Sequence, residues 1–389
     1  MDSILFVSFT NSAFWSDTED LWIKTAIYAA KNGHSVSCAI YDWPENRTHI
    51  NVLENAGCTI INFPNQGRLK RNFIEKIQSK IAAKSLKKYL ENLSAPGYDS
   101  VIVNLTHFEI LAEEIRDWYQ SLSRYVLLFH DHLESEFFKP NEINILRNWV
   151  TQSALSLFVS ERCKRYLEDK LNMVILNGDI FINPMSFEIP DLETAYYKGN
   201  HFVISMIAPI DIQYNAQDQL IRAIASPKWM QRNFIINLYG TGKDADRLEN
   251  LIARKGLTKK VFIKEDYNNE KRIIENSNLI LHTTHNSGMP KIIFEAMALC
   301  RPLLVSKTGD LAKYVINNNN GWIIKDASYD EIDIALEIAW NERNRWEEMG
   351  RRSFTILKKN YPNSVEQKLL QQILYKEVKS ITIKDAVAI

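Results

Sequence analysis

The segment from residue 287 to residue 302, SGMPKIIFEAMALCRP, combines residue types that could bind an anion and a vicinal diol. It follows an apolar run, residues 279–281, that predicts a buried strand. Gly288 permits close approach of the backbone to a ligand, and Pro290 suits the first turn of a helix. The amides and the positive dipole end of such a helix form an anion site. The Glu295 carboxylate, further along the helix, could accept hydrogen bonds from two adjacent hydroxyls. A sugar nucleotide offers both groups.

Further residues extend this candidate site. The amides of Met289 and Lys291 would cradle a diphosphate. Gly240 lies in a glycine turn at the end of another predicted strand, and Lys243 follows it. The side chains of Lys243 and Lys291 are candidates for positive charge, and a solvated surface position is the alternative for both. For Glu295 the alternative is a carboxylate that is simply favoured by the helix dipole.

Composition limits the classes of protein that the chain can represent. Its 389 residues suffice for two domains. Lysine and arginine together number 47, as do aspartate and glutamate, so no net field attracts nucleic acid. The start of the chain lacks a basic signal-peptide region, and no apolar run is long enough to span a bilayer. The four cysteines are scattered. We therefore expect a reduced, cytoplasmic protein, and peripheral contact with the inner face of a membrane stays open.

Strand-like and helix-like segments alternate along the chain, which predicts parallel sheets covered by helices. The organisation predicted is an N-terminal domain at 1–182, a linker at 183–199, a C-terminal domain at 200–358 and a terminal segment at 359–389 whose helix packs back on the N-terminal domain. The expected strands are Ile4–Phe9, Ser35–Tyr41, Thr59–Asn62, Ser100–Leu105, Tyr125–Phe129, Leu155–Ser160 and Met173–Leu176, then Phe202–Ile207, Phe234–Tyr239, Val261–Lys264, Leu279–His282, Pro302–Val305 and Gly321–Ile324.

Histidines suggest a second candidate site. His130 ends the predicted strand Tyr125–Phe129, with His132 two residues later. Together with His282 and His285 these side chains could be read as zinc ligands, but a third ligand with familiar spacing is missing, so we predict no metal. For His130 a plainly packed histidine is the alternative.

The segment 287–302 resembles the donor-site motif of the retaining GT-B glycosyltransferases of family 4, also called group 1. In that family a Glu, seven residues and a second Glu precede an Ala-Met-Ala helix, and Gly288 to Ala298 match this pattern. The weaker matches are Tyr239-Gly240-Thr241-Gly242, Leu176-Asn177-Gly178-Asp179, Arg301-Pro302, Gly309 and Asn320-Gly321. The resemblance implies a GT-B fold, with two Rossmann-like doubly wound parallel-sheet domains facing an interdomain cleft. It also puts His130 in the place of the family's N-domain active-site histidine.

The chain departs from the family pattern at several positions, among them the N-terminal glycine pair, which becomes roughly Ser16-Asp17. Ser287 replaces the first Glu, and Pro209 and Asn215 replace the Arg and Lys that usually hold the donor diphosphate. Because one missing donor of this kind commonly costs about 10²- to 10³-fold in rate, Lys243 and Lys291 are the first candidates to compensate.

The resemblance implies a hexosyltransferase that acts without a metal or other cofactor. Its donor would be a UDP-sugar, with UDP-glucose first and GDP-sugars next, and its acceptor a saccharide or lipid-linked saccharide. Residues 16–22 resemble cyanobacterial polysaccharide-cluster members, which suggests polysaccharide biosynthesis. Two rivals remain: a weakly active or inactive sugar-nucleotide-binding protein, and a GT-B sugar-nucleotide epimerase.

Overall fold

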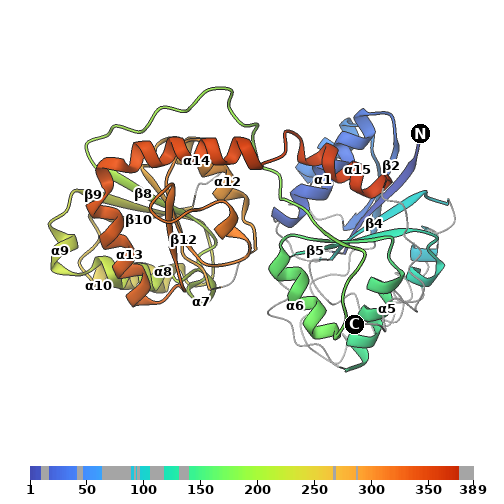
Figure 1. The fold of residues 1–389 in the computed structure, drawn as a ribbon, viewed down its shortest axis with the longest axis horizontal. Coiled ribbons are helices and arrows are strands. Elements are labelled where there is room, and N and C mark those ends of the chain that lie inside the picture. The colour runs from blue at the N-terminus through green and yellow to red at the C-terminus, as the bar shows by residue number, and fades with distance from the viewer. Residues whose placement is uncertain are drawn as a thin grey trace. The chain divides into compact units, whose positions relative to one another are not determined.

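The structure is a computed structural model that describes residues 1–9, 17–41, 47–63, 89–91, 93, 97–105, 118–130, 140–265, 269–285 and 288–375. The chain divides into two compact units (Figure 1), of which the first comprises residues 1–184 and 364–389 and the second residues 185–363. The segment expected as a linker, 183–199, therefore divides after Pro184, and nearly all of it belongs to the second unit.

The first unit contains a seven-stranded parallel sheet with the strand order β3-β2-β1-β4-β5-β6-β7. Every residue of β4 and β5 is buried, as expected for parallel strands covered on both faces. The helix α15 returns the end of the described chain to this unit, where it packs against α1 (Figure 1). The strands are β1 (Ser3–Ser8), β2 (Ser35–Tyr41), β3 (Thr59–Phe63), β4 (Ser100–Leu105), β5 (Tyr125–Phe129), β6 (Leu155–Phe158) and β7 (Gly178–Ile180), and the helices are α1 (Asp17–Lys31), α2 (Arg47–Asn55), α5 (Pro140–Gln152), α6 (Glu161–Leu171) and α15 (Val365–Tyr375).

The second unit contains a six-stranded parallel sheet with the order β10-β9-β8-β11-β12-β13. Its hydrophobic core includes Trp229, Phe234 and Trp340, whose rings make edge-to-face contacts. The strands are β8 (Phe202–Ile207), β9 (Phe234–Tyr239), β10 (Val261–Lys264), β11 (Leu279–His282), β12 (Leu303–Ser306) and β13 (Gly321–Ile324), and the helices are α7 (Ile212–Asn215), α8 (Gln217–Ile224), α9 (Pro227–Met230), α10 (Ala245–Arg254), α11 (Glu270–Glu275), α12 (Lys291–Ala298), α13 (Tyr329–Asn341) and α14 (Trp346–Asn360).

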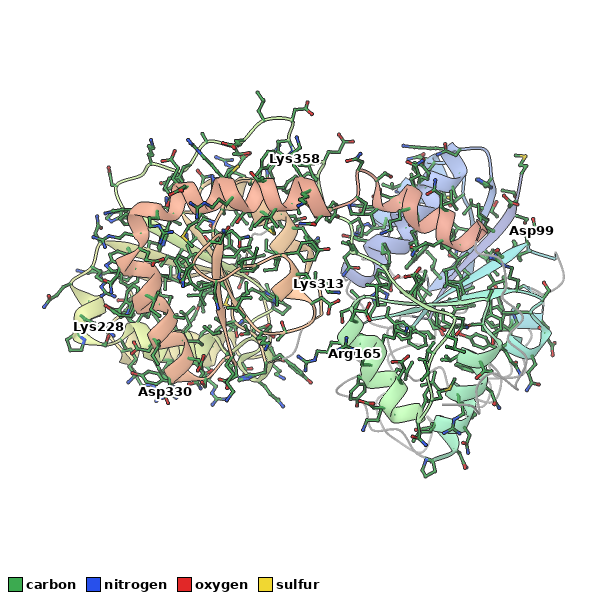
Figure 2. The ribbon with its side chains drawn as sticks, viewed as in Figure 1. Asp99, Arg165, Lys228, Lys313, Asp330 and Lys358 are labelled. Atoms are coloured by element: carbon green, nitrogen blue, oxygen red, sulfur yellow. The ribbon has the colours of Figure 1, made fainter. Side chains whose placement is uncertain are left out.

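These two sheets confirm the predicted α/β fold of two doubly wound parallel-sheet units. Charged side chains project from the outer faces of the helices, as Figure 2 shows for Arg165, Lys228 and Lys358. This distribution is usual for helices that turn an apolar face to a sheet and a polar face to solvent.

One predicted strand is wrong. Residues Met173–Leu176 do not form a strand, and the last strand of the first sheet is β7 instead. Asn172 ends α6 in the left-handed conformation, with φ of 49°, and the amide of Gly178 then donates to the carbonyl of Ile175 in a turn. The apolar run belongs to this connection, in which Ile175 is buried and its two neighbours are exposed.

Candidate functional site

The second sheet reverses its direction of winding at β8. From β8 the chain passes to β9 and β10 on one side, and then crosses to β11 and β12 on the other. All of these strands are parallel, so the loops after Ile207, Tyr239 and His282 leave the sheet at the same edge. In open α/β sheets ligands bind at this kind of switch point. The predicted donor-site residues follow β9 and β11.

The glycine turn after β9 lies against the loop after β8. A Cβ atom on Gly240, whose φ is 150°, would be 2.1 Å from the carbonyl oxygen of Ala208. A Cβ atom on Gly242 would be 2.3 Å from the carbonyl oxygen of Ile210, whose amide also donates to Thr241. The turn therefore needs glycine at both positions to bring the two backbones together.

The turn after β11 leads directly into α12. Pro290 precedes this helix in an extended conformation, and Gly288 and Met289 before it are buried. A Cβ atom on Gly309 would lie only 2.0 Å from the carbonyl oxygen of Gly288, so the loop after β12 packs tightly on this turn. Every residue of α12, Lys291–Ala298, is buried.

Glu295 is completely buried on α12. One carboxylate oxygen, Oε1, accepts a hydrogen bond of 2.7 Å from the amide of Ser186. The other, Oε2, has no hydrogen-bond partner among the described residues. A buried carboxylate oxygen without a partner is costly, which favours a ligand donor at this position.

Burial, and after it the neighbouring charge of Glu270, raise the pKa of Glu295 to about 7. Lys291 and the hydrogen bonds from Ser186 act in the opposite direction, because they stabilise the carboxylate. Protonation of Glu295 near neutral pH therefore depends on these three neighbours.

The ammonium group of Lys291 is directed into this cluster. Its Nζ atom lies 3.3 Å from Oε2 of Glu270 and donates to the hydroxyl of Ser186 at 3.0 Å, and the residue is only 8% exposed. The same hydroxyl donates to Glu270 at 3.0 Å. The positive charge of Lys291, which was predicted to bind a diphosphate, is thus paired with Glu270 within the protein.

Lys243, the other candidate cation, lies beside the loop after β8. Its ammonium is 2.8 Å from Oδ2 of Asp211 and its side chain is 60% exposed. In the same loop the carbonyl of Pro209 accepts hydrogen bonds from the side-chain amides of Asn215, at 2.9 Å, and Gln217, at 2.8 Å. Lys243 therefore places an exposed cation next to the segment in which the family's Arg and Lys are replaced.

The first unit has a buried polar cluster at the carboxyl ends of its central strands. Nε2 of His130 is 2.7 Å from Oδ1 of Asn104, and the amide nitrogen of Asn104 donates to Oε1 of Glu19 at 3.0 Å. Ser8 donates to the same oxygen, and Trp22 donates to Oε2. Because Glu19 orients the amide of Asn104, the imidazole donates its proton from Nε2. His130 is only 2% exposed. Glu19 and Asn104 were not predicted from the sequence. Asn104 could have been, because it lies near the end of a predicted strand, as His130 does.

Two of the predicted positions, Ser287 and His132, lie outside the described residues. Among the residues that are described, no group of three or more His, Cys, Asp or Glu side chains is arranged to hold a metal ion. Within the same ranges no helix is both long and apolar enough to cross a bilayer.

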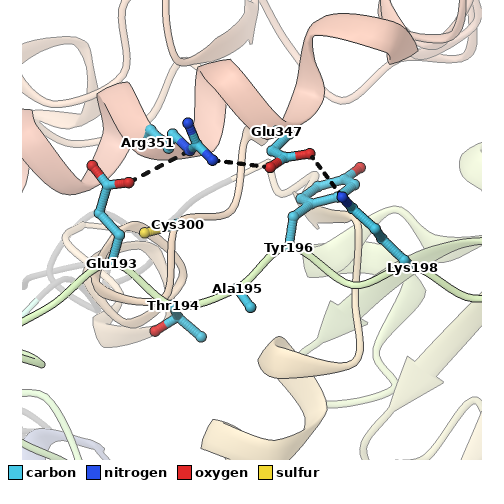
Figure 3. Close-up of a pocket in the computed structure, with 8 residues that line it drawn as sticks. All are labelled: Glu193, Thr194, Ala195, Tyr196, Lys198, Cys300, Glu347 and Arg351. Carbon is cyan, nitrogen blue, oxygen red and sulfur yellow. Dashed lines mark hydrogen bonds and ion pairs between the residues drawn. The ribbon is translucent and has the colours of Figure 1, made fainter.

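A cavity of about 300 Å³ lies elsewhere in the second unit, between the segment before β8, Cys300 and α14 (Figure 3). Its charged groups pair with one another: Arg351 lies 3.4 Å from Glu193 and 3.1 Å from Glu347, and Lys198 lies 3.8 Å from Glu347. None of the predicted site residues lines it, so the donor-site candidate remains the turn between β11 and α12.

The architecture matches that of known GT-B proteins. The structure of HepE from Anabaena, solved with UDP, superposes with a TM-score of 0.72 over 95% of this chain and 98% of that one, at 16% identity. A variant of TarM from Staphylococcus aureus superposes with a TM-score of 0.70 over 96% of this chain and all of the other, at 13% identity. At these identities the likeness establishes the GT-B fold.

Sequence comparison finds a family likeness over part of the chain. Residues 198–354 match the family described as Glycosyl transferases group 1, in agreement with the group 1 resemblance of the segment 287–302. The capsular polysaccharide biosynthesis glycosyltransferase CapM of Staphylococcus aureus is 23% identical over 220 residues, which is 55% of each chain. An uncharacterized glycosyltransferase of Methanocaldococcus jannaschii is 23% identical over 39% of its length. The chain thus aligns with about half of these relatives or less.

Proposed function

We propose that this protein is a retaining glycosyltransferase that transfers a hexose, glucose first, from a UDP-sugar to a saccharide or lipid-linked saccharide in polysaccharide biosynthesis. The observation that carries the proposal is Glu295, which presents a buried carboxylate oxygen without a described partner on the helix that follows the β11 turn. HepE has been solved with UDP-glucose, and the name of CapM refers to capsular polysaccharide biosynthesis. The first finding supports UDP-glucose as the donor, and the second supports a role in polysaccharide biosynthesis.

The site residues would divide the chemistry between them. Glu295 would accept the two ribose hydroxyls of the donor, and the backbone at Gly288 and the start of α12 would receive the diphosphate. As the bond between the anomeric carbon and the phosphate oxygen breaks, these dipoles and the nearby Lys243 would stabilise the negative charge of the departing UDP. The acceptor hydroxyl would attack from the same face and pass its proton to the departing phosphate oxygen, so that the configuration is retained. His130 would contact the transferred sugar.

We expect UDP-glucose binding and its slow hydrolysis to survive chelation. The site groups proposed here are a carboxylate, backbone amides and a lysine, so no metal ion is needed to hold the donor. Calorimetric titration with UDP-glucose before and after EDTA, with release of UDP followed by mass spectrometry, measures both. Loss of binding on chelation, with recovery in Mn²⁺ or Mg²⁺, would show that a metal has replaced the missing basic pair. No binding under any condition would overturn the proposed function.

A second function, donor binding with little or no transfer, is favoured by the loop after β8. The positions of Pro209 and Asn215 carry no charge, and the side chain of Asn215 is bonded to the carbonyl of Pro209. A folded protein that binds UDP-glucose tightly and neither hydrolyses it nor transfers glucose would establish this alternative.

We expect Lys243→Met to weaken UDP-glucose binding about 3- to 10-fold, because it removes an exposed cation beside this loop. The double change Pro209→Arg with Asn215→Lys should act in the opposite direction, by adding two charges near the diphosphate. Calorimetry measures both effects, and Lys255→Met, at an exposed position after α10, is the matched control. Equal affinities for all four proteins would show that this loop does not contact the diphosphate.

A further inference from the structure

Three residues, Ser186, Glu270 and Lys291, form a polar cluster with the carboxylate of Glu295. Ser186 comes from the chain that enters the second unit, Glu270 from the first turn of α11, and Lys291 from the first turn of α12. Ser186 contacts all of the others: its amide donates to Glu295, its hydroxyl donates to Glu270, and Lys291 donates to that hydroxyl.

The position of Lys291 needs this cluster. A cation in the first turn of a helix is opposed by the helix dipole, and a lysine that is only 8% exposed loses most of its hydration. Its contact with Glu270, at 3.3 Å, offsets both costs. Glu270 lies in the first turn of α11, where the dipole favours its negative charge. The pair is therefore a fixed source of two opposite charges beside Glu295.

We propose that Glu270 and Lys291 are positioning residues, which act on Glu295 together with Ser186 and determine how readily its carboxylate accepts the ribose hydroxyls of the donor. This role rests on the proposed function of α12 as the donor site. Neither side chain needs to contact the donor. Lys291 stabilises the charged carboxylate and Glu270 opposes it, while Ser186 holds Oε1 and leaves Oε2 for a ligand.

Ser186 is held beside the carboxylate by hydrogen bonds alone. Because Glu295 is fully buried, a hydroxyl reaches Oε2 only when the atoms that cover it move. Ser186 lies outside any helix or strand, so its hydrogen bonds to the cluster, and not a regular backbone ladder, hold it in place. These bonds can exchange for bonds to a ligand at little cost.

The prediction is a pair of opposite shifts in the pH dependence of donor binding. The charged carboxylate accepts hydroxyls better than the neutral acid, so affinity should rise with pH through the pKa of Glu295, about 7. Glu270→Gln removes a negative neighbour and should move the midpoint to lower pH. Lys291→Met removes a positive neighbour and should move it to higher pH. A shift of about half a unit to one unit is expected in each case.

UDP-glucose is the probe, because its diphosphate is esterified at both ends and does not titrate in this range, unlike that of UDP. Its affinity is measured by calorimetry from about pH 5.5 to about pH 8.5 for each protein. The double variant Glu270→Gln with Lys291→Met should return the midpoint towards that of the wild type. Ser186→Ala, which keeps both charges, should raise the midpoint, since the hydroxyl also stabilises the carboxylate. Glu249→Gln and Lys255→Met, on the exposed surface around α10, should leave it unchanged.

The outcomes separate this role from the proposed function. Opposite shifts that cancel in the double variant support the role, which a purely structural contribution to stability would not produce. Binding by folded variants with unmoved midpoints, or with both midpoints moved in the same direction, overturns the role and leaves the donor site intact. If the wild-type protein binds no UDP-glucose at any pH, the proposed function fails, and this role fails with it.

Discussion

Replacing Glu295 by glutamine is expected to weaken UDP-glucose binding about 10- to 100-fold at pH 8. The variant loses the charged acceptor for the ribose hydroxyls and keeps the shape of the side chain. Its amide oxygen can still accept the hydrogen bond from Ser186. Calorimetry with the folded variant measures the loss. Unchanged affinity would remove α12 from the donor site.

The same variant should unfold less easily than the wild type at high pH. The pKa of Glu295 is raised to about 7 in the folded protein, so the folded state favours the neutral acid. The stability that this provides is complete below the ordinary carboxyl pKa and is lost as pH rises through about 7. Glutamine stays neutral throughout. We therefore expect a gain on the order of 3 kcal/mol at pH 8 and none near pH 4.

Urea denaturation at the two pH values measures this difference, with Glu249→Gln as an exposed control. A gain in stability together with a loss of affinity would show that Glu295 lowers the stability of the folded protein and strengthens donor binding. This combination is typical of a binding residue. Equal stability of variant and wild type at pH 8 would contradict the burial of a titrating carboxylate at this position.

Replacing Arg301 by methionine is expected to lower the free energy of unfolding of the second unit by about 3–5 kcal/mol. Arg301 is completely buried, and its guanidinium donates to five backbone carbonyls, those of Ala195, Ile274, Glu275, Leu299 and Cys300. Four of them belong to the ends of α11 and α12. A cation at the carboxyl ends of two helices is favoured by both dipoles, and methionine would leave the carbonyls buried without a donor.

Arg351→Met is the matched control for this change. Arg351 makes ion pairs with Glu193 and Glu347 beside the cavity of Figure 3, but its side chain is 59% exposed. Exposed pairs of this kind contribute about 0–1 kcal/mol, so the control should unfold almost as the wild type does. Urea unfolding measures both variants. A loss below about 1 kcal/mol for Arg301→Met would show that water or rearrangement satisfies the carbonyls.

Most strands could be predicted from the sequence because parallel strands covered on both faces form continuous apolar runs. The bounds of β2, β4, β5, β8, β9, β10, β11 and β13 agree with those predicted. The apolar run Met173–Leu176 was wrongly predicted as a strand for the same reason. A left-handed residue and a turn, and not hydrophobicity, determine where β7 begins.

The sequence by itself determined the donor-site candidate, because the helix motif from Gly288 to Glu295 is local and its spacing can be read along the chain. Only the tertiary structure decided what surrounds Glu295. Ser186 is 109 residues away from it in the sequence, and no local pattern predicts that contact. The direction of the Lys291 ammonium also depended on packing, because α12 is buried on all sides and its periodicity shows no outer face. Likewise Asn104 and His130 meet because parallel strands bring their carboxyl ends to one edge of the sheet, and Glu19 joins them from the first turn of α1.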